Sequence, residues 1–425
     1  MRKTLENILR FLAKMILWRH KPEIVAVTGS VGKTNTKETI YHALKKYFKV
    51  RRNIKNYNNE IGVPLTILGQ DICPRIGLTG ILGWSAIFIK AISTILWQKN
   101  YPEILILEMG IRKPGDMKYL TSFIPVDVAV ITTIGEFPSH LEFFSSKEKL
   151  IKEKALLIKS LDKEGTAILN YDDSSVQEIG QGLPSELKKI QYGFEEGSDL
   201  RISNFDFSIY DLSKGEFGIN FKMEYQGSVV PVQSKRATGK HQVLSIAAAA
   251  GVGLHFGLNL VEISGAFKEY YSLPGRSNLI KGIKKTWIID DSYNASPLST
   301  ITALETLDQF SEKKRRKIAI LGDMLELGQK TEEGHRQVGQ KAAQIVDLLF
   351  VVGPRAAFIA DQAKKKGLAQ RKIFEFQTSK EAGLVIQKEL KEDDIILVKG
   401  SRSMRMEKIV KEIMAHPEKA SQLIV

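Results

Sequence analysis

One short segment near the N-terminus constrains the fold of this chain most strongly. It reads Thr28-Gly29-Ser30-Val31-Gly32-Lys33-Thr34 and directly follows the apolar run Ile24-Val25-Ala26-Val27, which is typical of a buried strand. Two glycines let backbone N–H groups converge on phosphate oxygens at a helix N-terminus, Lys33 adds a cation, and the Thr34 hydroxyl can ligate Mg2+. The GxxGKT spacing is shorter than the usual GxxxxGK[ST]. We therefore predict a strand, a phosphate-binding loop and a helix that hold a nucleoside triphosphate such as ATP.

Composition limits the class of protein. A chain of 425 residues exceeds what one core usually supports, so we expect two or three domains. The single cysteine, Cys73, excludes a disulfide framework and a cysteine metal site, and it suits a cytoplasmic location. A formal charge of +14 favours an anionic partner. Because no stretch interleaves aromatic and basic residues, we expect no nucleic-acid partner, and we expect a monomer.

The first 21 residues predict a basic amphipathic helix. Leu5, Ile8, Leu9, Leu12, Met15 and Ile16 recur at helical spacing. Six Lys and Arg side chains accompany them against the single acid Glu6. Two interpretations stay open, a helix packed on the next domain and a helix on the inner face of a membrane.

A second apolar stretch runs from Ile76 to Gln98 and contains Lys90 as its only charge. It approaches the roughly 20 residues that a bilayer span requires, but glycine, serine and threonine dilute it. We interpret residues 71–101 as an insertion that forms a helical hairpin arm for peripheral membrane contact or for a partner, in preference to a bilayer span.

Alternating strand and helix patterns predict an α/β fold with two domains after the N-terminal helix. In the central domain, residues 22–272, apolar runs at Ile104–Leu107, Val126–Ile131 and Ala167–Leu169 indicate a parallel sheet. From about Ile190 to Val232 the pattern changes to a small antiparallel β subregion, and an alanine-rich helix follows at 241–256. Residues 273–425 repeat the alternation, with strands expected at 287–289, 317–321, 348–352 and 395–398. That domain lacks GxGxxG, so no dinucleotide cofactor is implied.

Six blocks, in order along the chain, resemble the Mur ligase family. They are TGSVGKTNTKE (28–38), NNEIGVPLTIL (58–68), EMGIRKPGDMKYL (108–120), DDSYNASP (290–297), LGDMLELG (321–328) and LVKGSRSMRME (397–407). The resemblance implies a central ATP-binding domain with a phosphate-binding loop and a Rossmann-like C-terminal domain. It also implies an ATP-dependent amide ligase of peptidoglycan precursor synthesis that works through an acyl phosphate. The resemblance is greatest to the branch that joins D-alanyl-D-alanine to a UDP-N-acetylmuramoyl tripeptide.

The resemblance also assigns roles to individual residues. Mg2+ ligands would be Thr34, Glu108, His140 and a carbamylated Lys154, and these residues with Lys33 would form the catalytic set. Nucleotide contacts beyond the loop would come from Gln242, Arg276 and Asp291. The substrate side would be lined by Asn58, Asn59, Asn294, Asp323, Glu326, Lys399, Ser401 and Arg402.

Two departures from the family pattern stand out. Gln242 and Ser245 replace the asparagines of a Gly-x-His-Asn-x-x-Asn motif, although glutamine keeps an amide that can donate and accept. Only about twenty residues precede the first strand, which leaves no room for the family's N-terminal UDP-sugar-binding domain. We expect the UDP moiety to be held differently, or the acid substrate to be another muropeptide.

Three other functions compete with this one. The first is a Mur-type ligase with a different acid or amine, of the folylpolyglutamate or cyanophycin kind. The second is a GTPase-like switch or a nucleic-acid-dependent NTPase, which the absence of an Asn-Lys-x-Asp motif disfavours. The third is an inactive scaffold, which would be expected to lose Lys33, Glu108 or His140, yet all three are present.

Overall fold

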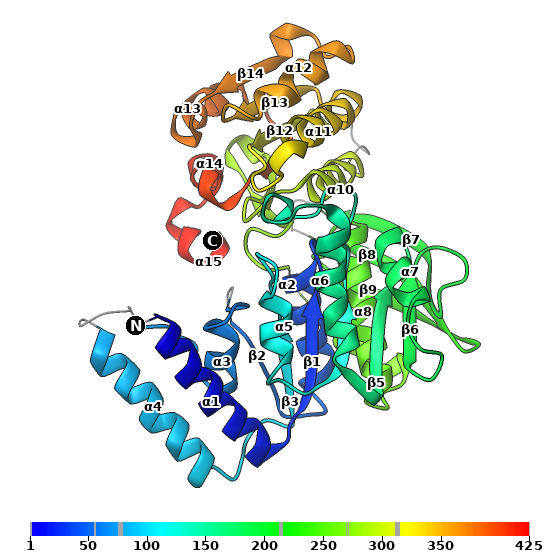
Figure 1. Cartoon of the computed structure of the whole chain (residues 1–425). Helices are drawn as coiled ribbons and strands as arrows, with labels where there is room; N and C mark the ends of the chain where they lie inside the picture. The colour runs from blue at the N-terminus through cyan, green and yellow to red at the C-terminus, as the bar shows by residue number, and fades with distance from the viewer. Residues whose placement is uncertain are drawn as a thin grey trace.

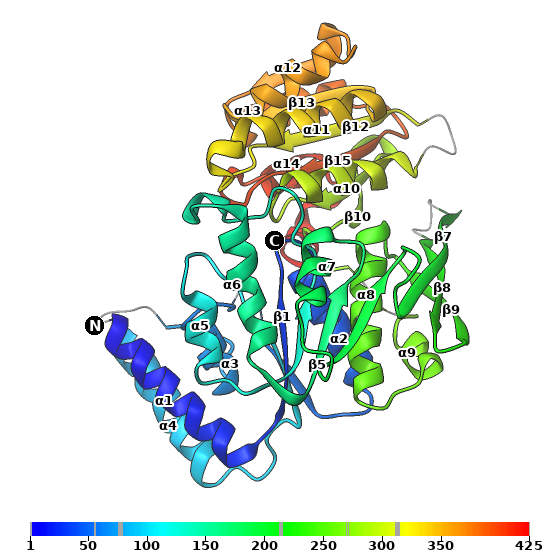
Figure 2. The ribbon, with the colours of Figure 1, turned by 45° about the vertical axis from the view of Figure 1, so that its right-hand side comes forward.

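Two α/β lobes stacked on one another form the bulk of the molecule (Figures 1 and 2). The computed structural model describes residues 2–424 except 55–56, 75–79, 212–215, 269, 271 and 311–314. One lobe is built on a nine-stranded sheet and the other on a six-stranded sheet. The fold is the predicted α/β one, a domain with a mainly parallel sheet followed by a second α/β domain.

The nine-stranded sheet has the order β2-β3-β1-β4-β5-β6-β7-β8-β9. Its strands are β1 (Glu23–Thr28), β2 (Val50–Arg52), β3 (Ile104–Glu108), β4 (Val126–Ile131), β5 (Leu161–Asn170), β6 (Lys188–Gly193), β7 (Leu200–Asp211), β8 (Glu216–Tyr225) and β9 (Ser228–Lys235). Pairing is parallel from β2 through β7 and antiparallel between β7, β8 and β9. The expected antiparallel subregion is present, but it begins at β7; Ile190 lies in β6, whose register with β5 is parallel.

Helices cover both faces of this sheet. They are α2 (Lys33–Leu44), α3 (Gly62–Ile67), α5 (Asp116–Thr121), α6 (Lys147–Lys159), α7 (Ser174–Gln181), α8 (Lys240–His255) and α9 (Leu260–Ala266). Alternate residues of β1 serve the two faces, since Val25 and Val27 join the core beneath α2 and α8 whereas Ile24 and Ala26 join the opposite one. A strand buried on both faces explains why its sequence is continuously apolar.

The C-terminal lobe has the strand order β10-β11-β15-β12-β13-β14. Its strands are β10 (Asn278–Lys281), β11 (Trp287–Asp291), β12 (Lys317–Gly322), β13 (Leu348–Val352), β14 (Ile373–Phe376) and β15 (Ile395–Lys399). Its helices are α10 (Pro297–Asp308), α11 (Thr331–Ile345), α12 (Ala357–Lys365), α13 (Ser379–Glu389), α14 (Glu407–Ile413) and α15 (Ala420–Leu423). All pairings except β10 with β11 are parallel, so the ends of β11, β12 and β15 meet at one edge of the sheet.

Two long helices lie side by side on the outer flank of the first lobe (Figure 1). The predicted N-terminal helix is α1 (Arg2–His20), which packs Leu9, Leu12 and Ile16 inward. The apolar stretch forms a single helix, α4 (Ile81–Leu96), so the expected helical hairpin is wrong for the part that the structure describes; residues 76–79 lie outside it. Among the described residues no helix has both the length and the apolar character needed to span a bilayer.

Candidate functional site

A cleft of about 1090 Å³ opens where the C-terminal edges of the two sheets face each other. The first lobe contributes the loop Ser30–Asn35, residues 58–60, Glu108 and His140 to its walls. The second lobe contributes Arg276, Asp291, Tyr293, Asn294 and Lys399. Residues separated by more than 350 positions in sequence therefore enclose one space.

The phosphate-binding loop is hydrogen-bonded to the residues that follow β4. Gly29 has φ +150° and Gly32 has φ +89°, conformations that favour glycine, and Gly32 caps α2. The N–H groups of Ser30 and Val31 donate to the Thr133 carbonyl at 2.8 and 3.0 Å. Lys33 Nζ folds back over the loop and donates to the Gly29 carbonyl at 2.9 Å. The loop thus has a fixed shape, with its cation positioned over it.

Glu108 lies beside the loop because β3 pairs in register with β1, which places Glu108 opposite Val27. Its Oε2 accepts the Thr34 hydroxyl at 2.9 Å and its Oε1 accepts the Asn58 amide at 2.9 Å. Burial acts to raise the pKa of Glu108, but the neighbouring cations Lys37, Lys33 and Arg276 lower it below its usual value. The carboxylate is therefore ionised and surrounded by groups that favour its charge.

Lys154, on α6, reaches the same loop from inside the protein. Its Nζ donates to the Gly29 carbonyl at 2.7 Å, and the side chain is almost completely buried. Burial lowers the pKa of Lys154 well below its usual value, and the nearby Lys33 lowers it further. A lowered pKa increases the proportion of the neutral amine, which is the form that reacts with electrophiles.

His140 connects the first lobe to the second. Its Nδ1 lies 2.5 Å from Glu326 Oε2, and Glu326 belongs to the loop after β12. The adjacent Glu142 N–H also donates to the Glu326 carbonyl at 3.4 Å. A hydrogen bond from His140 lowers the pKa of Glu326, with burial opposing this effect. The two predicted site residues therefore meet at the rim of the cleft.

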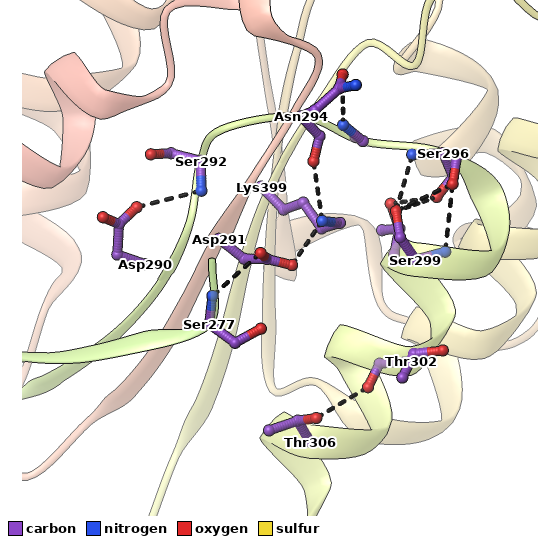
Figure 3. Close-up of polar contacts among 12 residues, drawn as sticks. Ser277, Asp290, Asp291, Ser292, Asn294, Ser296, Ser299, Thr302, Thr306 and Lys399 are labelled. Atoms are coloured by element: carbon purple, nitrogen blue, oxygen red, sulfur yellow. Dashed lines mark hydrogen bonds and ion pairs between the residues drawn. The ribbon is translucent and has the colours of Figure 1, made fainter. Parts of the chain in front are cut away.

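Lys399 connects residues of the C-terminal lobe that line the cleft (Figure 3). Its Nζ donates to Asp291 Oδ2 at 2.5 Å and to the Asn294 carbonyl at 2.9 Å. The Ser277 N–H donates to the other Asp291 oxygen at 3.1 Å. The register between β11 and β15 sets Asp291 directly opposite Lys399, so the ion pair follows from strand pairing.

Tyr293 lies between two guanidinium groups at this wall. Arg276 Cζ is 4.3 Å from the ring centroid and Arg402 Cζ is 5.1 Å from it. His241, at the start of α8, also lines the cleft, and burial lowers its pKa to about 4. An anion entering the cleft would meet Arg276, oriented by the ring, together with Lys33.

Several predicted site residues are placed elsewhere. The Gln242 amide is engaged internally, accepting the Thr238 N–H at 3.0 Å and donating to the Ser272 hydroxyl at 2.7 Å. Asp323 accepts the Ala356 N–H at 2.7 Å and Ser401 accepts the Leu325 N–H at 2.9 Å. These three buried side chains stabilise loops and do not line the cleft. Arg402 does not line the cleft either, but its guanidinium group lies near the ring of Tyr293, which does.

The sequence also contained residues whose importance was overlooked. Lys37 lies four residues after Lys33 on α2; its Nζ donates to the Asn53 carbonyl at 2.6 Å and lies 3.8 Å from Glu108. Asn53 fixes the Glu108 backbone by two hydrogen bonds, of 2.8 and 3.1 Å. The i, i+4 spacing of the two lysines was a usable signal for Lys37, whereas no local pattern marked Asn53.

Known proteins resemble the chain over nearly its whole length. The Mur ligase middle domain matches residues 27–71 and 90–253, and the Mur ligase glutamate ligase domain matches residues 275–402. The UDP-N-acetylmuramoyl-tripeptide--D-alanyl-D-alanine ligase of Bacillus subtilis (strain 168) is 29% identical over 412 residues, which cover 96% of this chain and 79% of that protein. The ligase of the same name from Escherichia coli (strain K12) is 26% identical over 403 residues, which cover 95% of this chain and 79% of that protein.

Solved structures agree with these sequence matches. The MurF ligase of Thermotoga maritima, crystallised with ADP, has a TM-score of 0.76 and 27% identity, covering 98% of this chain and 84% of that one. A crystal structure of MurF from Acinetobacter baumannii has a TM-score of 0.77 and 24% identity. The match covers 95% of this chain and 79% of that one. Because the Mur ligase middle domain and the glutamate ligase domain together match most of the chain, on the two sides of one cleft, this chain belongs to the Mur ligase family of ATP-using ligases.

Proposed function

We propose that this ligase adds D-alanyl-D-alanine to a UDP-N-acetylmuramoyl tripeptide during peptidoglycan precursor synthesis. The main structural support for this function is the cleft, in which Lys33 and Thr34 of the phosphate-binding loop face Arg276 and Lys399 of the second lobe. Relatives named for this reaction in several bacteria align with 90% or more of the chain, which supports this choice of substrates.

Amide formation in water needs an activated acid. Transfer of the ATP γ-phosphoryl group to the tripeptide carboxylate breaks the Pγ–O bond of ATP and forms an acyl phosphate. The free amine of D-alanyl-D-alanine then attacks the acyl carbon, and phosphate leaves as a proton is lost from nitrogen. In this scheme Lys33 and Arg276 neutralise the charge on the transferred group, which is the main task of a protein in phosphoryl transfer.

We infer that Mg2+ binds between the loop and Glu108. The Thr34 hydroxyl and the ionised Glu108 carboxylate are 2.9 Å apart in the wall of the cleft, and hard oxygen donors of this kind suit Mg2+ with phosphate and water as its other ligands. Bound there, the ion would screen charge on the phosphate oxygens. A carbamate on Lys154 and the His140 imidazole are the proposed ligands of a second ion.

The second lobe and the Asn58–Asn59 loop would face the peptide substrates. Asn58 and Asn59 line the cleft next to Glu60, and Asn294 lines it from the opposite side. Lys399 is held by Asp291 and by the Asn294 backbone, so it stabilises this wall and leaves the Asn294 side chain at the cleft. We assign these asparagines to orientation of the two peptides.

The test is phosphate release from ATP with UDP-muramoyl tripeptides, measured with and without D-alanyl-D-alanine. We expect release that depends on the dipeptide, and a loss of roughly 100-fold or more in kcat for Lys33→Ala and for Glu108→Ala. Lys388→Ala, on an exposed helix of the second lobe, is the control and should retain activity. Dipeptide-independent release would reject the proposed acceptor, and unchanged rates in both variants would reject the site.

A further inference from the structure

The outer flank formed by α1 and α4 presents an unusual concentration of exposed apolar side chains. On α1 the side chains of Ile8, Phe11 and Trp18 are exposed, Phe11 by 63% and Trp18 by 70%. Together with Met15 they follow a 3-4-3 spacing, so they form one stripe along the helix. The opposite face of α1, with Leu9, Leu12 and Ile16, is buried, so the stripe is not needed for packing within the lobe.

The second helix, which packs against α1, also has an exposed apolar face. Trp84, Ile87, Ala91 and Thr94 of α4 are buried, whereas Leu82, Ile89 and Leu96 point outward with exposures of 87%, 68% and 57%. Trp97, directly after the helix, is 71% exposed. Among the described residues, most of the exposed large apolar side chains lie on these two helices. We call Ile8, Phe11, Trp18, Leu82, Ile89, Leu96 and Trp97 the flank surface.

Most charged side chains beside the flank surface are positive. Lys3, Lys14, Arg19 and Lys21 are exposed on or just after α1, and Lys90 and Lys99 accompany α4. Residues 81–99 contain no acidic side chain, and the one acid of α1, Glu6, is paired with Arg2 at 3.0 Å. An exposed apolar stripe with tryptophan and a basic border is the pattern of helices that lie in the interface of an anionic bilayer.

The flank surface is also separate from the parts that the ligase fold requires. The family match begins at residue 27, after α1, and it omits residues 72–89, which include the first half of α4. The two helices nevertheless pack on each other, since His20 of α1 contacts the Thr94 carbonyl of α4 at 3.1 Å. His20 also stacks on Tyr101, which follows α4, with the ring centroids 4.5 Å apart. Both helices expose their outer side chains in the part of the chain that the structure describes.

We propose that the flank surface docks on the surface of an anionic phospholipid bilayer, with α1 and α4 lying in the interface plane and neither helix crossing it. The apolar stripe would enter the boundary between headgroups and acyl chains while the lysines and arginines contact lipid phosphates. Arg2, the first residue of α1, lines the catalytic cleft and pairs with Glu60 at 2.6 Å. Docking therefore holds one end of the cleft near the membrane.

Flotation of the full chain with vesicles tests this inference independently of ligase activity. We expect binding to phosphatidylglycerol-containing vesicles at low salt, weaker binding to pure phosphatidylcholine, and loss of binding as salt screens the charges. The double variant Trp18→Ser/Leu96→Ser should reduce vesicle partitioning by at least about tenfold. The triple variant Lys14→Glu/Arg19→Glu/Lys21→Glu should reduce it by roughly 100-fold or more.

Matched control variants distinguish binding through the flank surface from nonspecific binding of the protein to vesicles. Val261→Ser/Leu384→Ser removes apolar side chains of similar exposure elsewhere, and Lys364→Glu/Lys366→Glu/Lys388→Glu makes the same charge change on the second lobe. Both controls should bind as the unmodified protein does. ATP-dependent phosphate release without vesicles should be the same in all variants, which shows that each one is folded.

Tryptophan fluorescence gives a second measurement. Of the four tryptophans, Trp18 and Trp97 belong to the flank surface, whereas Trp84 and Trp287 are buried. Brominated lipids should quench emission, and Trp18→Phe/Trp97→Phe should abolish that quenching. Failure of the protein to bind anionic vesicles at low salt would overturn the proposal. A second result would also overturn it. If sedimentation shows a dimer, and if Trp18→Ser/Leu96→Ser dissociates that dimer but leaves vesicle binding unchanged, the flank surface binds a second copy of the chain.

Discussion

The imidazole Nδ1 of His140 lies 2.5 Å from Glu326 Oε2, and this pair joins the two lobes at the rim of the cleft. Both residues have left-handed backbone conformations, with φ of 69° and 64°. Each sits in a short loop that follows a strand of its own sheet. Two loops with defined conformations therefore hold the lobes in the arrangement that places Arg276 opposite the phosphate-binding loop.

Glu326→Gln should weaken this connection in a pH-dependent way. The pKa of Glu326 is lowered by its hydrogen bond from His140, so its contribution to stability is present above the ordinary value of 4.5 and is lost as the pH falls through the lowered pKa. Because the pair is partly exposed, we expect a difference of about 0.5–1 kcal/mol in unfolding free energy at pH 7. Urea unfolding of both proteins across pH 3–7 measures it.

The control is Glu418→Gln, which removes the same kind of partner from His416 at an exposed site. That substitution should change the unfolding free energy by less than about 0.5 kcal/mol at every pH. A Glu326→Gln protein whose stability follows the unmodified protein over the whole pH range would contradict the role of the pair.

Gly29→Ala should weaken nucleotide binding. A Cβ on Gly29 would lie 2.0 Å from Thr132 Oγ1, and Thr132 cannot move easily because its hydroxyl donates to the Val31 carbonyl at 2.7 Å. Overpacking of this kind costs about 1–3 kcal/mol and would displace the loop. Isothermal titration with ATP should show affinity reduced by roughly tenfold or more.

Gly265→Ala is the matched control for Gly29→Ala. Gly265 lies in α9, and a Cβ there would meet open space. We expect unchanged ATP affinity and a gain of about 0.5–1 kcal/mol in stability, since alanine favours helix. Equal ATP affinities in the two variants would show that the backbone at Gly29 tolerates a side chain.

Tyr293→Ala should raise the KM for ATP more than Tyr293→Phe. The ring lies between Arg276 and Arg402, at 4.3 and 5.1 Å, and orients the guanidinium groups through its face. Loss of a cation–π contact of about 1 kcal/mol corresponds to a change of roughly fivefold, whereas phenylalanine keeps the face. Phe358→Ala, which removes a ring near Arg336 away from the cleft, should leave KM unchanged. Equal KM values for the Ala and Phe variants would exclude this role.

Local sequence patterns predicted the strands and the phosphate-binding loop well because buried parallel strands are continuously apolar and the loop needs glycine at fixed positions. The short edge strands β2 (Val50–Arg52) and β14 (Ile373–Phe376) were missed, since three or four residues give no clear period. The antiparallel region was placed too early because Ile190 lies in a strand whose parallel partner comes from earlier in the chain.

The site was predicted less completely than the fold. The structure places Lys33 and Glu108 in the wall of the cleft. Asp323 and Ser401 also follow strand ends, but they accept hydrogen bonds from backbone N–H groups. Residue type and spacing cannot distinguish a carboxylate that faces a cleft from one that supports a loop. Likewise, the apolar composition of residues 76–98 indicated a membrane or partner surface, whereas only the packing of α4 on α1 shows which of its side chains are exposed.

Lys154 should make the protein less stable at neutral pH than a variant that lacks its amine. Burial lowers the pKa of Lys154 well below 10.5, so between the lowered value and 10.5 the unfolded chain binds a proton that the folded chain does not. Stability therefore rises with pH across that window. We expect Lys154→Met to be more stable than the unmodified protein at pH 7, with a difference that narrows towards pH 10, measured by urea unfolding without nucleotide.

The same lowered pKa predicts a dependence of activity on CO2. A neutral Lys154 amine can attack CO2, forming an N–C bond and releasing a proton, and the resulting carbamate converts a buried cation into an anion suited to Mg2+. Ligase activity should fall in CO2-depleted buffer, return on addition of bicarbonate, and be absent in Lys154→Met. Lys152→Met and Lys159→Met, exposed positions on the same helix, should keep both activity and its CO2 dependence. Full activity without CO2 would mean that the amine itself, hydrogen-bonded to the Gly29 carbonyl at 2.7 Å, serves only to brace the loop.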